Sequence, residues 1–168
     1  SFGGRWVVAY NGEIYNHLLL RKQLDAEGAA PPWRGHSDTE TLLACVEAWG
    51  LKATLKASVG MFAIALWDRS ERTLYLARDR MGEKPLYYGW QGDTFLFGSE
   101  LKALRAHPAF EARVDRWALS LLLRHNYVPA PRSIYEGIRK LPPVTWLCIN
   151  AAKRQAEPSA YWSLSDVA

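Results

Sequence analysis

The fold of this chain is decided by one stretch of its sequence, Tyr10-Asn11-Gly12-Glu13-Ile14-Tyr15-Asn16. The stretch follows the apolar run 6–9 and precedes a helical pattern that starts at Asn16. We therefore predict a strand over 5–10 that stops at a tight turn at Asn11-Gly12, where glycine can take a positive φ. The alternative is an ordinary hairpin turn, because Asn-Gly is the commonest hairpin signal. Since a helical pattern follows instead of a second strand, a strand-to-helix junction is the prediction.

Such a junction offers two hydrogen-bond donors that point at one spot. They are the backbone N–H of Gly12 and the side-chain carboxamide of Asn11. Two neutral donors aimed together can stabilise a developing oxyanion. Glu13 follows directly, and its carboxylate is suited to holding an ammonium group. The sequence thus indicates a candidate catalytic and binding site at 11–13.

The composition limits the classes of protein to which the chain can belong. Its 168 residues suffice for one domain with a core of its own. Hydrophobic residues make up 49% and charged residues 23%, which is typical of a globular protein. The formal net charge is +4, but Lys and Arg are scattered singly among Asp and Glu, so we expect no nucleic-acid partner. No apolar run is long enough to span a bilayer, so we expect no membrane partner and a cytoplasmic location.

Two cysteines occur, Cys45 and Cys148, and apolar residues flank both. We interpret them as small core residues, not as metal ligands or nucleophiles. A disulfide between them stays open at this point. We expect no metal site.

The tetrapeptide Ser37-Asp38-Thr39-Glu40 predicts the start of a helix that ends at Gly50. Ser37 with Glu40 three residues later fits a capping box. Asp38 is a first-turn carboxylate that the cap does not require. It could be there only because acidic residues favour the first turn of a helix, or it could bind a ligand.

The remaining pattern predicts an α+β fold, with antiparallel sheets and helices packed on them. The continuous apolar run 60–68 predicts a strand that is buried on both faces. The predicted helices are 16–28, 37–50, 99–104 and 115–123, and the other predicted strands are 73–77, 86–90, 94–98 and 145–149.

The heptapeptide resembles the Asn-Gly-Glu-Ile-Tyr-Asn signature of class II glutamine amidotransferase domains, in particular those of glutamine-dependent asparagine synthetases. Other segments are similar to elements of that family, and they occur in the family's order. They are 37–40, 77–88, 97–104, 127–131 with 134–143, and the pair Tyr161-Trp162. The resemblance therefore extends over nearly the whole chain.

The resemblance implies an Ntn-hydrolase-like layered fold and L-glutamine as the substrate. It implies that the side-chain N–H of Asn11 and the backbone N–H of Gly12 form an oxyanion hole. It implies that Glu13 and Asp38 hold the α-amino group of glutamine. By the same resemblance, 1–150 is a glutamine amidotransferase domain that lacks its N-terminal segment. The segment 151–168 then begins a linker to a synthetase domain, which would use ATP and magnesium to make asparagine from aspartate.

The family's nucleophile is a cysteine at the mature N-terminus, and a nearby Arg element grips the substrate carboxylate. Neither is found in these 168 residues, so we expect this chain alone to hydrolyse no glutamine. Ser1 is a conceivable substitute nucleophile, but in the family the segment before this strand lies far from the nucleophile in sequence. We therefore expect residues to precede Ser1 in the parent protein.

We interpret four charged residues as structural, not catalytic: Arg78, Asp79, Lys84 and Glu100. Val144 stands where the family usually has glycine, and a β-branched residue resists a positive φ.

Two alternative functions are left open for the chain. A non-catalytic interaction module with the same fold is one alternative, and an amidotransferase for another ammonia acceptor is a second. A homodimer is left open.

Overall fold

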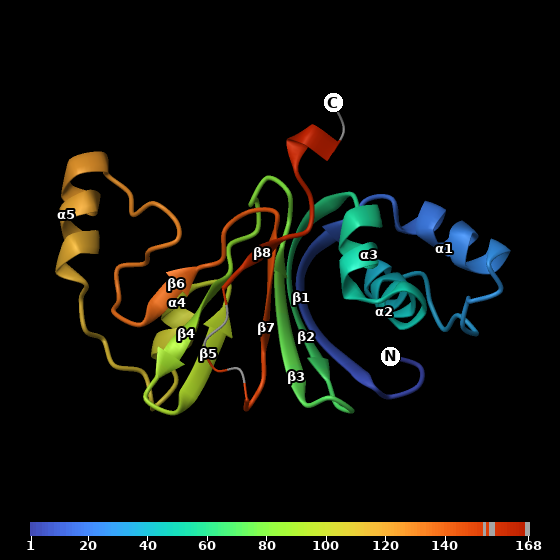
Figure 1. The fold of residues 1–168 in the computed structure, drawn as a ribbon, viewed down its shortest axis with the longest axis horizontal. Helices are drawn as coiled ribbons and strands as arrows, with labels where there is room; N and C mark the ends of the chain where they lie inside the picture. The colour runs from blue at the N-terminus through green and yellow to red at the C-terminus, as the bar shows by residue number, and fades with distance from the viewer. Residues whose placement is uncertain (153, 155–156, 167–168) are drawn as a thin grey trace.

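The computed structural model covers the 168-residue chain and describes residues 1–152, 154 and 157–166. The chain forms layers that follow one another along the longest axis of the molecule (Figure 1). Helices α1 to α3 cover one face of a five-stranded sheet, and a three-stranded sheet lies on its other face. Helices α4 and α5 lie beyond the second sheet. The predicted α+β architecture is confirmed.

Both sheets are antiparallel. The first has the order β1-β2-β3-β7-β8, and the second has the order β5-β4-β6. The strands of the first sheet are β1 (Trp6–Ile14), β2 (Gly60–Asp68), β3 (Thr73–Arg78), β7 (Thr145–Ile149) and β8 (Ser159–Ala160). Those of the second are β4 (Tyr87–Gln91), β5 (Thr94–Gly98) and β6 (Ile138–Lys140). Within the described residues, β1 is therefore an edge strand.

The predicted turn at Asn11-Gly12 is wrong, because β1 continues through both residues to Ile14. Gly12 pairs with Phe62 on β2. Its φ is 155°, and a Cβ atom placed there would lie 2.1 Å from the carbonyl oxygen of Met61. Gly12 is thus required for a close approach of two backbones inside a sheet, not for a turn.

The helices are α1 (His17–Ala26), α2 (Asp38–Trp49), α3 (Leu51–Ala57), α4 (Leu101–Arg105) and α5 (Arg116–His125), with a short 3₁₀ turn at Leu164–Asp166. Helix α3 was not predicted. It begins directly after Gly50, which has a φ of 77° and ends α2. The glycine that stops one helix thus lets the chain bend at once into the next.

Ser37 caps α2 as predicted, since its Oγ accepts a hydrogen bond from the Thr39 N–H at 3.1 Å. The capping box itself is not formed in its usual reciprocal way. The Glu40 carboxylate accepts from the N–H groups of Arg34 at 2.7 Å and Gly35 at 3.1 Å. Glu40 therefore fastens the preceding loop to the helix instead of satisfying the cap residue.

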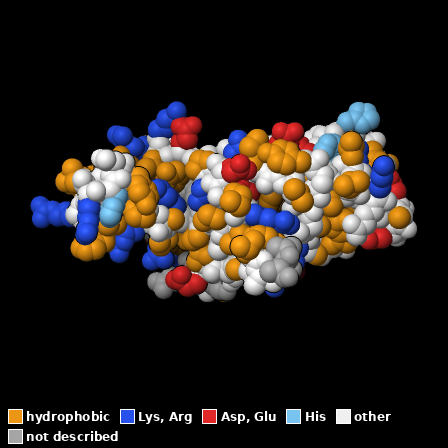
Figure 2. Space-filling view, turned by 90° about the horizontal axis from the view of Figure 1, so that it is seen from above, with side chains coloured by type: hydrophobic (Ala, Val, Ile, Leu, Met, Phe, Trp, Pro, Cys, Tyr) orange, Lys and Arg blue, Asp and Glu red, His pale blue; other side chains and the backbone are white. Residues whose placement is uncertain are grey.

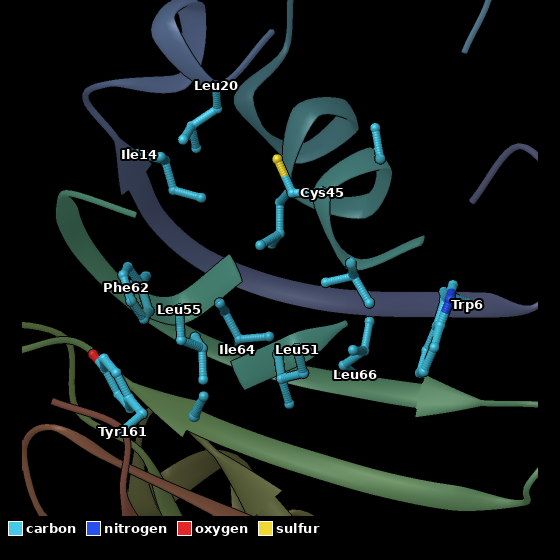
Figure 3. Packing of buried hydrophobic residues seen from close by; sticks show 14 of the residues in the cluster. Trp6, Ile14, Leu20, Cys45, Leu51, Leu55, Phe62, Ile64, Leu66 and Tyr161 are labelled. Carbon is cyan, nitrogen blue, oxygen red and sulfur yellow. The ribbon is translucent and has the colours of Figure 1, made fainter. Parts of the chain in front are cut away.

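The largest core cluster lies between helices α1 to α3 and the first sheet (Figure 3). Strand β2 is buried on both faces, as its continuous apolar run predicted. Phe62, Ile64 and Leu66 face the helices, whereas Ala63 and Ala65 face the second sheet. The labelled side chains of Figure 3 come from both layers: Trp6, Ile14, Leu20, Cys45, Leu51, Leu55, Phe62, Ile64, Leu66 and Tyr161.

The charged connector after β3 is held by its own side chains. Asp79 is fully buried, and its carboxylate accepts four backbone N–H groups. They belong to Phe62 (3.3 Å), Met81 (3.0 Å), Glu83 (2.9 Å) and Lys84 (2.9 Å). Arg78 donates to the carbonyl oxygens of Gly82, Lys84 and Leu141. These contacts support the structural interpretation of Arg78 and Asp79.

Val144 adopts the left-handed conformation with a φ of 58°, which a β-branched residue resists. Its N–H donates to the carbonyl oxygen of Asp79 at 3.0 Å, and its own carbonyl accepts from the Tyr161 N–H at 3.0 Å. Tyr161 is 1% exposed, and its hydroxyl donates to the Arg78 carbonyl at 2.9 Å. The turn at Val144 thus joins the connector to the C-terminal part of the chain.

The predicted linker, 151–168, includes residues 153, 155–156 and 167–168, which lie outside the described residues. In its described part, β8 pairs with β7 and Tyr161 packs into the first core cluster. The boundary at 150 stays a prediction. None of the helices in the described residues has the length and apolar character needed to cross a membrane.

Candidate functional site

The open edge of β1 carries the first element of the site. Along an antiparallel strand, consecutive N–H groups point to opposite sides. The Tyr15 N–H donates toward the β2 side, to Val59 at 2.8 Å, whereas the Ile14 N–H donates to the Asp38 carboxylate at 3.0 Å. Gly12 lies two residues before Ile14 and therefore directs its N–H to the same side. The predicted donor is available because β1 is the edge strand of the described sheet, not because the chain turns there.

Asn11 supplies a second donor beside Gly12. Its side chain lies on the face of β1 that is directed toward the second sheet, and its Nδ2 donates to Ser99 Oγ at 3.0 Å. One N–H of the carboxamide is thereby held, which leaves the other for a ligand. A small cavity of about 160 Å³ adjoins Asn11 and is lined also by Leu86, Phe97 and Ser99. This volume corresponds to about five water molecules.

Asp38 reaches the same edge from the helix layer. It is the first residue of α2, and its Oδ2 accepts hydrogen bonds from the Tyr10 hydroxyl at 2.7 Å and the Ile14 N–H at 3.0 Å. Oδ1 has a long contact of 3.5 Å with the Thr39 hydroxyl. Burial alone would raise the pKa of Asp38, but the hydrogen bonds from the Ile14 N–H and the Tyr10 hydroxyl, with a smaller contribution from the Thr39 backbone N–H, outweigh it and lower the pKa. Asp38 is therefore held as a carboxylate.

Tyr10 is the partner that keeps Asp38 in place. Burial, and then the hydrogen bond to the Asp38 carboxylate, raise the pKa of Tyr10 far above its usual range. The phenol consequently remains a donor at all physiological pH values. The sequence interpretation took Tyr10 only as the end of a strand and missed this role. The alternation of β1, in which Tyr10 shares a face with Ile14 and lies toward the helices, is the signal that could have found it.

The spacing of these groups matches the length of one glutamine. Gly12 and Ile14 are separated by two residues, which is about 7 Å along a strand. An extended glutamine has five bonds between its amino nitrogen and its side-chain amide oxygen, and these span about 6 Å. A glutamine lying along the edge of β1 would thus reach Asp38 with its amine and Gly12 with its amide oxygen.

Glu13 is placed differently from Asp38. Its side chain is exposed and lies on the face of β1 that carries Asn11, whereas Asp38 contacts Tyr10 on the opposite face. The structure therefore brings Asn11, Gly12 and Asp38 to one edge but places the two carboxylates on different faces of the strand. The shared role of Glu13 and Asp38 in holding an amino group stays a prediction.

Neither cysteine is placed to act at this edge. Both are free thiols, so no disulfide joins them in the described structure. Burial raises the pKa of Cys45 to about 12, which disfavours the reactive thiolate. Cys148 lies on β7, three strands from β1 and thus about 14 Å away. Their interpretation as non-nucleophilic residues agrees with these positions.

Ser1 lies at the wrong end of β1. Its amino group donates to the Trp6 carbonyl at 2.6 Å, and its hydroxyl accepts from the Trp6 N–H at 3.2 Å. Gly12 is six residues beyond Trp6, or about 20 Å farther along the strand.

A metal site was not expected from the sequence. Within residues 1–152, 154 and 157–166, no three His, Cys, Asp or Glu side chains are grouped as metal ligands.

Comparison with known proteins identifies the family to which the chain belongs. The family model described as "Glutamine amidotransferase domain" matches residues 1–162. The chain therefore belongs to the glutamine amidotransferase domain family, and its fold is that of the Ntn-hydrolase amidotransferases, as predicted.

Among its relatives are glutamine-hydrolyzing asparagine synthetases. The chain is 42% identical over 142 residues to asparagine synthetase 3 of Bacillus subtilis (strain 168), covering 84% of this chain and 23% of that protein. It is 33% identical over 162 residues to the putative asparagine synthetase 2 of Methanocaldococcus jannaschii, covering 95% of this chain and 30% of that protein. The chain thus spans less than a third of either relative and is homologous to their glutaminase domains.

Solved structures show the same fold at lower identity. The structure titled as the allosteric regulatory enzyme of purine biosynthesis has a TM-score of 0.66 and 22% identity, covering 94% of this chain and 28% of that one. The glutamine phosphoribosylpyrophosphate amidotransferase from B. subtilis has a TM-score of 0.63 and 22% identity, with coverages of 94% and 29%. At this identity the likeness concerns the fold alone.

Proposed function

We propose that this domain binds L-glutamine along the open edge of β1 and stabilises the oxyanion formed when its side-chain amide is hydrolysed. One observation carries the proposal. The Gly12 N–H points to the open edge beside the Asn11 carboxamide, two residues from an N–H that the Asp38 carboxylate already binds. Donors for an oxyanion and an acceptor for an ammonium group are thus spaced for one glutamine.

The reaction has two steps in this proposal. A thiolate attacks the amide carbon of glutamine, and the carbonyl oxygen becomes an oxyanion that accepts hydrogen bonds from Gly12 and Asn11. The C–N bond then breaks, and the nitrogen leaves as ammonia after taking up the proton that the thiol lost when the thiolate formed. Water hydrolyses the thioester to glutamate and regenerates the thiol. One oxyanion donor contributes about 10²–10³-fold in rate. The attacking thiolate has to come from a residue other than Cys45 and Cys148, whose positions exclude them.

The relatives' names support a proposal for the function of the whole protein. We propose that the ammonia passes to a synthetase domain in the same polypeptide, where ATP and magnesium activate aspartate to form asparagine. The similarity to enzymes called asparagine synthetases supports this acceptor. An acceptor other than aspartate is the alternative, since the residues that would select it lie outside this chain. A cytoplasmic location belongs to the same proposal.

The binding step can be tested on the 168-residue chain by ¹⁵N NMR. Titration with L-glutamine is expected to shift the Gly12 amide and the Asn11 side-chain NH₂ in a saturable way. Asp38→Asn is expected to weaken this binding, whereas Asp93→Asn, at a side chain that is 96% exposed, serves as the matched control. No saturable shift at Gly12 would refute the proposal. Ammonia release by this chain alone is not expected, because neither cysteine reaches the site.

A non-catalytic interaction module is the second candidate, and helix α5 favours it. On the helix, Trp117 is 62% exposed and Leu123 78%, and Tyr127, two residues after the helix, is 61% exposed. Figure 2 shows hydrophobic side chains among Lys and Arg at the end of the molecule that carries α5. If glutamine leaves the β1 edge unperturbed while α5 variants abolish association with another protein, this second function replaces the first.

A further inference from the structure

The Asp38 carboxylate is bound unequally at its two oxygens. Oδ2 accepts the Tyr10 hydroxyl at 2.7 Å and the Ile14 N–H at 3.0 Å. Oδ1 has the 3.5 Å contact with the Thr39 hydroxyl, which is too long for a good hydrogen bond. One oxygen is thus fixed by two short bonds, and the other is left for a cation.

We propose that Tyr10 is a positioning residue for glutamine, whose hydroxyl fixes Asp38 Oδ2 so that Oδ1 is presented to the α-amino group of the substrate. This inference rests on the proposed function of the β1 edge as a glutamine site. It adds a residue to that site which touches Asp38 and not the substrate.

The surroundings of Tyr10 make it a firm support. Its ring is half-buried and packs against the core cluster between the helices and the first sheet. Tyr10 lies on the strand that also carries Gly12. The position of the Asp38 carboxylate is therefore fixed relative to the Gly12 N–H by the backbone of β1. A carboxylate with two side-chain torsions loses conformational freedom on binding, and a fixed partner removes part of that cost.

Two other titratable groups act on this pair through their charge. They are Glu13 on β1 and His17 at the start of α1, whose charges act on Tyr10 and Asp38 respectively. A pH profile of binding therefore has to separate Asp38 from His17. The variant His17→Gln, made with and without Tyr10→Phe, removes the imidazole from the comparison.

The experiment compares two ligands on the 168-residue chain by NMR titration. One is L-glutamine, and the other is glutaramate, which has the same amide and carboxylate but lacks the α-amino group. The unmodified chain is expected to bind L-glutamine more tightly. Tyr10→Phe is expected to weaken L-glutamine binding about tenfold and to leave glutaramate unchanged. Tyr15→Phe is the matched control, because Tyr15 is a 55% exposed tyrosine on the same segment.

A pH titration gives a signature that a merely structural role would not produce. Hydrogen bonds lower the pKa of Asp38, so loss of the Tyr10 hydroxyl raises it toward that of a free aspartate. Since glutamine binding needs the ionised carboxylate, affinity falls as the pH drops through this pKa. In Tyr10→Phe, the loss of glutamine affinity on acidification is therefore expected at higher pH than in the unmodified chain. The midpoint of the ¹³C titration of the Asp38 carboxyl is expected to move in the same direction.

The outcomes separate this inference from the proposed function. If the unmodified chain does not prefer L-glutamine over glutaramate, both the Asp38 contact and the role of Tyr10 are overturned. If the unmodified chain prefers L-glutamine and Tyr10→Phe retains the full preference for L-glutamine over glutaramate, only the proposed role of Tyr10 is overturned. A measurement without any variant guards against misfolding: the Tyr10 ring carbon that bears the hydroxyl must shift when Asp38 titrates, and an unchanged signal overturns the proposal.

Discussion

Asp38 and Asp79 both bind backbone N–H groups, but they differ in what remains of their hydrogen-bonding capacity. Asp79 is 0% exposed, and four N–H groups occupy its two oxygens. Asp38 is half-buried at the edge of β1, with two short bonds on Oδ2 and a long contact on Oδ1. Sequence alone presents both as charged residues next to turns or helix starts.

The difference teaches how to separate a structural carboxylate from one that binds a ligand. A buried carboxylate whose oxygens are all used stabilises the fold and has nothing left for a substrate. A carboxylate with one oxygen fixed and the other open is both oriented and unsaturated, which is what a binding site needs. The same chemical change, Asp to Asn, should therefore give opposite results at the two positions.

The largest effect on stability is expected for Asp79→Asn. Replacing one oxygen with an NH₂ group leaves two buried N–H donors facing another donor. We expect the free energy of unfolding to fall by about 3–5 kcal/mol, measured by urea denaturation. Glutamine binding should persist in whatever fraction stays folded. A loss below about 1 kcal/mol would show that the connector does not depend on this carboxylate.

Asp38→Asn should do the reverse. The remaining oxygen still accepts from Tyr10 and Ile14, so the free energy of unfolding should change by about 1 kcal/mol or less. Removal of the charge opposite an ammonium group should weaken L-glutamine binding by about 10–100-fold, measured by calorimetry. If Asp38→Asn instead destabilised the fold as much as Asp79→Asn, the distinction between a ligand-binding and a structural carboxylate would be wrong.

Val144→Gly sharpens the comparison on the Asp79 side. Val144 donates to the Asp79 carbonyl from a left-handed conformation, which costs an L-residue about 1–2 kcal/mol. Glycine removes that cost but adds freedom to the unfolded chain, so a net gain in stability of about 0.5–1 kcal/mol is expected. The control is Val114→Gly, at a valine without a positive φ, where thermal unfolding should show a loss instead of a gain.

The smallest effect is expected far from both carboxylates, at Leu123→Gln on α5. Leu123 is 78% exposed, and glutamine has a similar helix propensity. The free energy of unfolding should change by no more than about 0.5 kcal/mol, measured in the same urea series. A loss above about 1 kcal/mol would mean that the outer face of α5 packs within this chain.

Long, strongly patterned elements could be predicted from sequence, and short or context-dependent ones could not. The run that forms β2 and the helix that Ser37 caps were both found, because burial on two faces and capping leave clear local signals. Strand β6, with three residues, and helix α3, which restarts directly after Gly50, carry no such signal. The end of β1 was misplaced because Asn-Gly favours turns, whereas pairing with β2 holds this Asn-Gly in a sheet.

The site residues show the same division. Asn11, Gly12, Glu13 and Asp38 were named from chemistry and resemblance, but their relative placement could not be. Which N–H groups of β1 point outward depends on the register with β2, and that register is a property of residues about fifty positions apart. The hydrogen bond of Tyr10 depends on α2 beginning beside the end of β1, which no local pattern records.

The open edge of β1 has a further consequence, for the solution behaviour of the chain. A strand edge with free N–H groups is a template on which another extended polypeptide can pair. In the described structure the Gly12 N–H, which would bind the amide oxygen of glutamine, is also a donor that a foreign strand would use, whereas the Ile14 N–H is already bound by Asp38. Glutamine and a second copy of the chain would therefore compete for the Gly12 N–H, and bound glutamine would disfavour edge-to-edge association. Bound glutamine would in this way reduce aggregation of the chain.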